Sequence, residues 1–290
     1  MPNLRDILRR RRSVQSTRQI TRAMKMVAAA KLRKAQSRVQ DARHYESELD
    51  HLVASLLYRD PELSHPFVRP ETDPQSAVHV VVLTADRGLC GGYNANVLRA
   101  VRHHLETTFC GRKSYLSAVG RKAIEHYRKL NIPVLNSWEN VLEQYTPAQA
   151  GVIAEDLKNS YLDGTCGELW IAYTQFVSAV SQRVRVERLL PIQPQQVASG
   201  LRTDHLFSPD RQTVCDEVLK RYLSTRVFVS GLEAYASVQG ARMTAMENAT
   251  SNATEMIAFL TLSYNRARQA AITKEIIEIA SGADAVSASS

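Results

Sequence analysis

Both ends of this chain are almost free of the residues that break helices. No glycine or proline occurs between Pro2 and Pro61, and none occurs between Gly240 and Gly282. Glycine and proline disfavour or interrupt a helix, so each of these stretches can form a single continuous helix. At 1.5 Å per residue the first stretch would span roughly 80 Å, several times the length of an ordinary globular helix. Such a length is typical of a coiled coil or a shaft.

Small and apolar residues recur every three or four positions along the first helix, which predicts a stripe close to a heptad repeat. The stripe consists of Ile20, Met24, Ala28, Leu32, Ala35, Val39, Ala42, Tyr45, Leu49, Leu52 and Leu56. Asn3 is a candidate N-cap, with Asp6 in the acidic position of a capping box. Four prolines in residues 61–74 end the helix and predict an extended linker.

The period changes in residues 77–207. Short apolar runs predict strands at residues 78–83, 115–119, 133–135, 169–176 and 183–190. Helical patterns lie between them, at residues 94–106, 121–130 and 147–162. Thr146 and Pro147 form a good cap and first helical position, and Gly164 follows the end of that helix. Alternating strands and helices predict a Rossmann-like α/β domain with a largely parallel sheet, and the last two strands predict a hairpin.

Ser208 and Pro209 again form a pattern of cap and first helical position, and Asp210 favours the positive end of the helix dipole. The second long pattern runs to Ile279, and Gly282 is the expected stop. The expected division is therefore a helix at 1–60, a linker at 61–76, an α/β domain at 77–207 and a helix at 208–290. We expect the two long helices to form an antiparallel coiled coil, a shaft with the α/β domain at one end.

The charge is uneven. The chain carries a net charge of +8, and residues 1–38 hold twelve lysines and arginines against the single acid Asp6. Arg11, Arg18, Arg22 and Lys25 share one face of the first helix. Three interpretations stay open: a solvated face, a surface surrounded by acidic protein loops, or a coiled-coil protein that binds nucleic acid. The absence of aromatic residues from positions 1–44 and the alanine-rich stripe count against nucleic acid.

Other functional classes have little support. The four cysteines have no CxxC spacing, which predicts reduced, mostly buried thiols and no metal site: Cys90, Cys110, Cys166 and Cys215. The histidines are scattered, and no catalytic triad or carboxylate pair is recognisable. No apolar run reaches the 18 or so residues that a membrane span needs. We therefore expect no catalytic residues and no cofactor in this chain.

The loop at residues 86–92 follows a predicted strand and precedes a predicted helix. Phosphate-binding loops occupy this place, but the loop lacks both the GK[ST] of a P-loop and the GxGxxG of a dinucleotide site. A structural turn is the favoured interpretation, and a partner-binding surface is the second. We call its central residues the foot loop: Arg87, Gly88, Leu89, Cys90 and Gly91.

Three motifs in order resemble the gamma subunit of the F1 part of ATP synthase. The first is QITRAMKMVAAAKLRKA at residues 19–35, and the second is DRGLCGGYN at residues 86–94. The third has two parts, ARMTAM at residues 241–246 and YNRARQAAITKE at residues 264–275. The resemblance extends over nearly the whole chain.

The resemblance implies a central shaft, present in one copy, turning inside a ring of three alpha and three beta subunits. It implies that the α/β domain lies at the foot of the shaft with the epsilon subunit and the membrane c-ring. The complex would be peripheral on the cytoplasmic face of a bacterial inner membrane, and ion flow would drive ATP synthesis. Nucleotide chemistry would belong to the alpha and beta subunits.

The resemblance also implies roles for individual residues. Met24 and Lys25 would face an acidic loop of beta, whereas Arg268, Gln269 and Thr273 would meet its hydrogen-bonding catch region. Three isoleucines would enter an apolar bearing at the top of the ring: Ile272, Ile276 and Ile279.

Some positions depart from the family pattern. Arg11 replaces a usual isoleucine, which adds charge to the first helix. Val238 and Gly240 interrupt a usual Ser-Glu-x-Ala-Ala-Arg-Met run, which removes a glutamate contact, and Gly240 is expected to soften the helix by about 1 kcal/mol relative to alanine. The region around Cys215 lacks the two-cysteine insertion of the chloroplast form, so we expect no thiol switch.

Overall fold

Two long helices begin and end the chain. The structure, a computed structural model, describes residues 4–59, 65–68, 75–192, 207–208 and 210–287. Helix α1, Leu4–Arg59, has 56 residues and helix α5, Arg211–Ser287, has 77. The described residues between them form β1 Val78–Leu83, α2 Tyr93–Glu106, β2 Ser114–Val119, α3 Arg121–Lys129, β3 Val134–Trp138, the short 3-10 helix η1 Leu142–Gln144, α4 Pro147–Leu162, β4 Glu168–Phe176 and β5 Gln182–Leu190.

The strands form one mixed sheet in the order β3-β2-β1-β4-β5. Strands β3, β2, β1 and β4 run parallel, and β5 is an antiparallel edge strand hydrogen-bonded to β4. Strand β1 lies at the centre, and all six of its residues are buried, as expected for a parallel strand covered on both faces. The predicted α/β domain and its terminal hairpin are confirmed.

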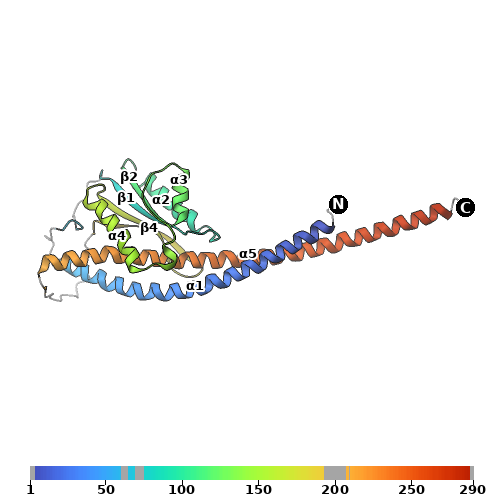
Figure 1. Cartoon of the computed structure of the whole chain (residues 1–290), viewed down its shortest axis with the longest axis horizontal. Helices are drawn as coiled ribbons and strands as arrows, with labels where there is room; N and C mark the ends of the chain where they lie inside the picture. The colour runs from blue at the N-terminus through green and yellow to red at the C-terminus, as the bar shows by residue number, and fades with distance from the viewer. Residues whose placement is uncertain (1–3, 60–64, 69–74, 193–206, 209, 288–290) are drawn as a thin grey trace. The chain divides into compact units, whose positions relative to one another are not determined.

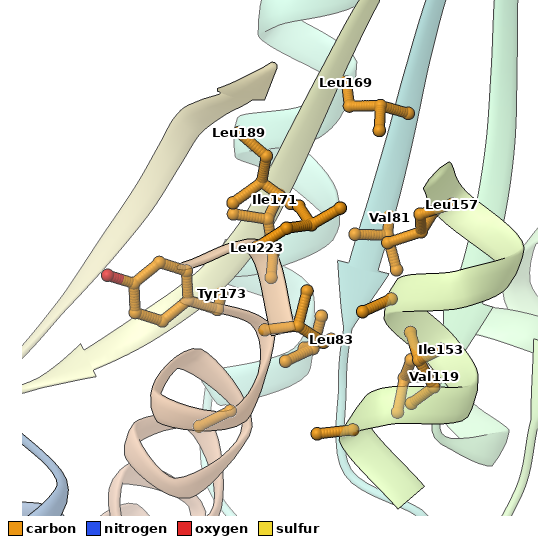
Figure 2. Packing of buried hydrophobic residues seen from close by; sticks show 14 of the residues in the cluster. Val81, Leu83, Val119, Ile153, Leu157, Leu169, Ile171, Tyr173, Leu189 and Leu223 are labelled. Carbon is orange, nitrogen blue, oxygen red and sulfur yellow. The ribbon is translucent and has the colours of Figure 1, made fainter. Parts of the chain in front are cut away.

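Helices cover both faces of this sheet (Figure 1). Because alternate side chains of a strand point to opposite faces, Val80 and Val82 pack among residues of α2 and α3, such as Val97 and Ile124. The other face carries the larger cluster, drawn from β1, β4, α4 and α5 (Figure 2). Its central side chains include Val81, Leu83, Ile153, Leu157, Ile171 and Leu223.

His79 interrupts the apolar run of β1 without exposing it. Its ring nitrogens lie 2.9 Å from Ser160 Oγ and 2.8 Å from Ser117 Oγ. Burial lowers the pKa of His79 to about 4, so the imidazole is neutral at pH 7. Two hydroxyl partners thus satisfy a fully buried polar ring, which is a structural role.

The chain separates into two compact units. In the first, residues up to Val27 of α1 pair with residues from Ala245 onward in α5. Thr21 Oγ1 lies 2.8 Å from Thr250 Oγ1 and Lys25 Nζ lies 2.6 Å from Glu247 Oε1. Residue numbers fall along one helix as they rise along the other, so the pairing is antiparallel.

The second unit, Ala28–Thr244, contains the sheet and the remaining parts of both long helices. Here too α1 and α5 are antiparallel: Arg43 Nε lies 2.7 Å from Glu233 Oε1, and Arg226 Nη1 lies 3.0 Å from Glu46 Oε1. Three stripe residues of α1 enter the main cluster of this unit: Leu32, Ala35 and Val39.

The predicted stripe of α1 is correct only in part. Ala28, Leu32, Ala35, Val39, Leu49 and Leu56 are buried. Ile20 and Tyr45, however, are 57% and 48% exposed, and Thr21 takes the buried position beside Ile20. An α-helix has 3.6 residues per turn, so a straight helix drifts out of phase with a 3.5-residue repeat.

The expected boundaries of α5 are wrong at both ends. The helix begins at Arg211, and its cap is Asp210, not Ser208: Asp210 Oδ1 accepts the Thr213 N–H at 2.9 Å. At the other end α5 continues to Ser287, past the predicted stop at Gly282. A single glycine inside a helix costs only about 1 kcal/mol, which a long helix tolerates. The predicted cap Asn3 and the predicted first helical position Pro209 lie outside the described residues.

Of the proline-rich stretch, the structure describes residues 65–68. They form a turn with a bridge between His65 and Val68. Phe67 is 2% exposed, and its carbonyl accepts the Ile192 N–H at 2.7 Å. His65 and Phe67 are therefore packed onto the α/β core, whereas Pro66 is exposed.

Candidate partner-binding surfaces

Two side chains anchor the loop between β1 and α2. Asp86 Oδ1 accepts the N–H groups of Arg121 and Asn140, at 3.0 and 2.8 Å. Asn94 Oδ1 accepts the Ala85 N–H at 2.9 Å, and its amide nitrogen lies 3.3 Å from Cys90 Sγ. Both anchors use backbone donors, which agrees with the favoured interpretation of this segment as a structural turn.

The same segment packs against α5 within the second unit. Cys90, Tyr93 and Ala85 form a small apolar cluster with Val238 of α5. The Tyr93 hydroxyl donates to Ala234 O at 3.2 Å, and burial raises the pKa values of both Tyr93 and the Cys90 thiol. Val238, one of the departures from the family pattern, therefore fills an apolar contact under the loop.

Leu89 lies at the exposed tip of the foot loop. It has a φ of 61° and is 63% exposed, and Gly91 has a φ of 58°. Positive φ is unfavourable for leucine, so the surrounding anchors hold it there. Arg242 Nη2 reaches Arg87 O at 3.4 Å, a further link from α5 that the sequence alone did not indicate. An exposed leucine on a firmly held loop is suited to contact another protein.

Gly240 allows close approach of the turn between β4 and β5. A Cβ on Gly240 would lie 3.2 Å from Ala179 O and 3.3 Å from Gln182 Nε2. Helix α5 passes through Gly240 without a break. The missing side chain thus has a packing role in addition to its expected effect on helix stability.

Met24 and Lys25 lie in the first unit. Met24 is half-buried, whereas its neighbours Met26 and Val27 are 68% and 56% exposed. Lys25 is held by Glu247, a partner that sequence reasoning missed because it lies 222 residues away. In the same unit the Arg11 guanidinium lies 5.6 Å from the ring centroid of Tyr264, a cation–π contact, while Arg11 Nε is buried without a hydrogen-bond partner among the described residues.

Arg268, Gln269 and Thr273 are exposed on α5. Within the described part of the chain they make no hydrogen bond or ion pair with another side chain. The isoleucines beside them are also uncovered: Ile272, Ile276 and Ile279 are 47%, 61% and 73% exposed. Exposed isoleucines in this number are unusual on a protein surface and are typical of interaction sites.

The pairing of the first unit explains this exposure. Tyr264 faces Arg11. Beyond these residues α5 continues 23 residues to Ser287, whereas α1 continues only seven to Leu4, as their bounds show. From Ile272 to Ser281 every side chain is exposed. The predicted contact residues on α5 therefore lie at or beyond the last part of α5 that α1 covers.

Part of the basic charge of α1 is used inside the chain. Lys31 pairs with Glu143, Arg38 donates to Tyr145 O, and Arg43 pairs with Glu233. Together with Lys25, which pairs with Glu247, these contacts bind three cations of the basic stretch 1–38, and Arg43 beyond it, to groups of the same chain. They weaken the interpretation of α1 as a reader of nucleic acid.

The described residues contain no group of three or more His, Cys, Asp or Glu side chains that could hold a metal ion. Cys90, Cys166 and Cys215 are buried and Cys110 is exposed, which confirms that the cysteines are mostly buried. Among the helices that the structure describes, none is long and apolar enough to span a membrane.

Known proteins match this chain over nearly its whole length. A family model described as ATP synthase matches residues 3–286. The ATP synthase gamma chain of Moorella thermoacetica is 46% identical over 292 residues, covering 99% of this chain and 100% of the relative. That of Symbiobacterium thermophilum is 44% identical and covers 98% of each chain.

Solved structures share the fold. A chain of the Euglena gracilis mitochondrial ATP synthase (OSCP/F1/c-ring, rotational state 3) superposes with a TM-score of 0.72 at 21% identity, covering 98% of this chain and 94% of that one. A rotor chain from the same organism in rotational state 1 gives 0.67 at 20% identity, with 93% and 98% covered. On the family match and the full-length relatives, this chain belongs to the ATP synthase gamma chain family.

Proposed function

We propose that this chain is the central rotor shaft of an ATP synthase. It couples proton or sodium flow through a membrane sector to the conformational cycle of catalytic beta subunits, in ATP synthesis or hydrolysis. The observation that carries the proposal is the full-length match to gamma chains, 46% identical over 292 residues. The two long helices and the uncovered end of α5 support it.

The division of labour along the chain follows from this role. Residues 1–60 and 208–290 act as the shaft, and residues 77–207, reached through 61–76, act as the foot that meets the epsilon subunit and the c-ring. One copy serves a ring of three alpha and three beta subunits. Catalysis belongs to that ring, so this chain needs no catalytic residue, cofactor or metal of its own. The assembly is peripheral on the cytoplasmic face of a bacterial inner membrane.

The mechanism rests on broken symmetry. A single asymmetric helix pair inside a threefold ring touches the three beta subunits differently. A contact shifts the conformational equilibrium of a subunit only by its difference in affinity between states. Different contacts therefore bias the three sites toward different states, and rotation moves each bias to the next site.

We assign the contacts as follows. Lys25 and Met24 meet an acidic loop of beta, and the exposed Arg268, Gln269 and Thr273 form hydrogen bonds with a second loop. The isoleucines at 272, 276 and 279 lie in an apolar bearing that covers their exposed surface. The foot loop, with Leu89 at its tip, contacts a partner at the foot.

The first test is assembly. The chain is mixed with the alpha and beta subunits of its own organism, and the mass of the product is measured by light scattering after size separation. One copy per three alpha–beta pairs is the expected result. If the chain elutes alone and instead binds duplex DNA with an affinity that falls steeply with salt, the alternative of a nucleic-acid-binding coiled coil replaces the shaft.

The second test addresses the contact residues. The double variant Arg268→Ala and Gln269→Ala is expected to assemble but to hydrolyse ATP more slowly, by about tenfold or more, because a lost hydrogen bond costs about 0.5–1.5 kcal/mol, and about 1.5–3 kcal/mol where one partner is charged. Arg128→Ala is the matched control, an exposed arginine on α3. Equal activity of both variants would remove Arg268 and Gln269 from the interface.

A further inference from the structure

Residues of α2 and α3 line a groove. These two helices lie on the same face of the sheet (Figure 1). The volume of the groove is about 450 Å³, within the range of small-molecule sites. Five side chains that carry or can carry positive charge line it, against one acid: Arg99, Arg102, Lys122, His126 and Lys129, with Glu125. Neither the foot loop nor the long helices contribute to this lining.

Most of the positive charge in the groove is uncompensated. Glu125, the only acid among the lining residues, forms an ion pair with Lys122 at 2.7 Å. Arg99 has a single long contact, 3.5 Å, to the neutral Asn96 Oδ1. Arg102 and Lys129 have no acidic partner among the residues that the structure describes. Cations gathered from two helices without counter-charges repel one another, so an anion between them would relieve that repulsion.

The positive charges of the groove act on the side chain of His126. Its pKa is lowered first by burial, and then by the charges of Arg102 and Lys129. The two cations therefore act on the same point inside the groove, although they come from different helices. An anion bound there would oppose both charges and raise the pKa of His126.

The lining also restricts the kind of anion. The apolar part consists of small or aliphatic side chains, Ala95 and Leu98, and contains no Phe, Tyr or Trp on which a nucleobase could stack. The cations line a groove of only about 450 Å³, which suits a short ligand better than an extended acidic peptide. Arginine and lysine form strong charge-assisted hydrogen bonds to phosphate oxygens.

We propose that the groove between α2 and α3 binds a short phosphate chain, with Arg99 and Arg102 of α2 and Lys129 of α3 as its ligands. The three ligands belong to the foot, residues 77–207, but none of them lies in the foot loop or on the surfaces assigned to beta and the bearing. Inorganic polyphosphate and a nucleoside triphosphate present the same phosphates. The base of the nucleoside triphosphate is expected to add nothing to the binding affinity.

The test measures binding of tripolyphosphate to the full-length chain by calorimetry in about 0.15 M salt, where exposed charges are screened beyond about 8 Å. ATP and adenosine are the companion probes. Tripolyphosphate is expected to bind, ATP to bind no more tightly, and adenosine not to bind. Tighter binding of ATP than of tripolyphosphate would contradict the claim that the base adds nothing to the affinity. If neither tripolyphosphate nor ATP binds, the site itself is refuted.

A variant pair locates the site. Arg102→Ala with Lys129→Ala is expected to weaken binding about tenfold or more, since two charge-assisted contacts are lost. Arg33→Ala with Lys34→Ala removes the same charge from exposed positions on α1 and is expected to leave the affinity unchanged. An equal loss in both pairs would mean attraction by net charge alone and would overturn the proposal.

The ring proton resonances of His126 give a readout that does not depend on mutation. Tripolyphosphate is expected to raise the pKa of His126 in an NMR titration, while His103, exposed on α2 and outside the groove lining, serves as the reference. A His126 pKa that does not move at saturating tripolyphosphate would overturn the location. Oligoglutamate is the last probe, and tighter binding of it than of tripolyphosphate would assign the groove to an acidic protein segment.

Discussion

Arg226 of α5 lies at the centre of a cluster of carboxylates in the second unit. Its guanidinium is 3.0 Å from Glu46 and 3.9 Å from Asp50, both on α1, and 3.1 Å from Glu187 on β5. Asp50 Oδ1 is buried without a hydrogen-bond partner. Burial raises the pKa of Glu46 to about 7; Arg226 opposes the shift, and Asp50 adds to it. Three acids thus share one guanidinium, and burial disfavours the charged form of Glu46.

This cluster predicts a pH-dependent stability. The pKa of Glu46 is higher in the folded chain than its ordinary value of 4.5, so the folded state binds the proton more tightly. The cost of ionising Glu46 is absent below about pH 4.5, grows up to about pH 7 and is constant above that. Glu46→Gln is therefore expected to gain stability relative to the wild type between pH 5 and pH 8, by on the order of 1–3 kcal/mol.

Urea unfolding of both proteins at pH 5, 6, 7 and 8 measures this difference. Glu48→Gln is the control, because Glu48 lies on the same helix but is exposed, and its difference from the wild type should not follow pH in this way. A Glu46→Gln difference that is constant across the series would contradict the prediction.

Gly231 is a second residue whose role the structure reveals. It lies inside α5, where alanine would normally be more stable by about 1 kcal/mol. A Cβ at this position would overlap the ring of Tyr145, which is 1% exposed and stacks on Phe228. Gly231→Ala is expected to destabilise the chain by about 1–3 kcal/mol, because a packed ring must move.

Gly151 provides the matched control. It lies inside α4, and nothing lies within 4 Å of the Cβ that alanine would add. Gly151→Ala is therefore expected to stabilise the chain by about 0.5–1 kcal/mol. Opposite signs of the two changes in urea unfolding are the expected result, and a gain in stability from Gly231→Ala would show that Tyr145 moves freely.

At the scale of elements, Asp86 links three parts of the α/β domain. It follows β1 and accepts N–H groups from the start of α3 and from Asn140, just after β3. Asp86→Ala would leave both amides without this acceptor, at an expected cost of about 1–3 kcal/mol in the free energy of unfolding. Asp163→Ala, at the exposed end of α4, is the comparison, and an equal effect of both substitutions would argue against the anchoring role.

Element types were predictable because their signals are local. The lack of glycine and proline predicted α1, the Thr146-Pro147 pair predicted α4, and the apolar run at 78–83 predicted a buried strand. Boundaries were less predictable, because Ser208 and Asp210 are both good caps and only the backbone decides between them. Gly282 was predicted to end α5, but the helix continues through it to Ser287. A single glycine therefore does not by itself predict the end of a helix.

The candidate surfaces were predictable only in outline. Family motifs marked Lys25 and Arg268, but no local signal shows that Lys25 pairs with Glu247 while Arg268 remains exposed. The same holds for the Arg226 cluster, where Glu46 lies 180 residues away in the sequence. Periodicity identifies an apolar face, as at Ile20, but not whether a neighbouring helix covers it.

At the scale of the whole molecule, the burial of the thiols predicts that the activity of the complex does not respond to reducing agents. Cys90, Cys166 and Cys215 are at most 3% exposed, and burial raises the pKa of Cys166 to about 11. Buried protonated thiols react slowly. We expect the native chain to show one fast-reacting thiol, which Cys110→Ser removes, and three more on unfolding. Two fast thiols, or a change in ATP hydrolysis of the complex under reducing agent, would contradict the absence of a thiol switch.

The uncovered end of α5 provides the sharpest test of the proposed shaft, because stability and function should separate there. Ile276 and Ile279 are 61% and 73% exposed, so replacing both by glutamine is expected to change the free energy of unfolding of the isolated chain by no more than about 0.5 kcal/mol each.

In the assembled complex the same isoleucines would be buried in the bearing, where each lost apolar contact costs about 1–3 kcal/mol. The variant should therefore hydrolyse ATP several-fold more slowly than the wild-type complex. Val152→Gln, at a 58% exposed position of α4, removes a similar apolar surface outside the bearing and should leave hydrolysis unchanged. If the isoleucine variant also hydrolyses ATP at the wild-type rate, the end of α5 turns without an apolar bearing, and its exposed isoleucines need another explanation.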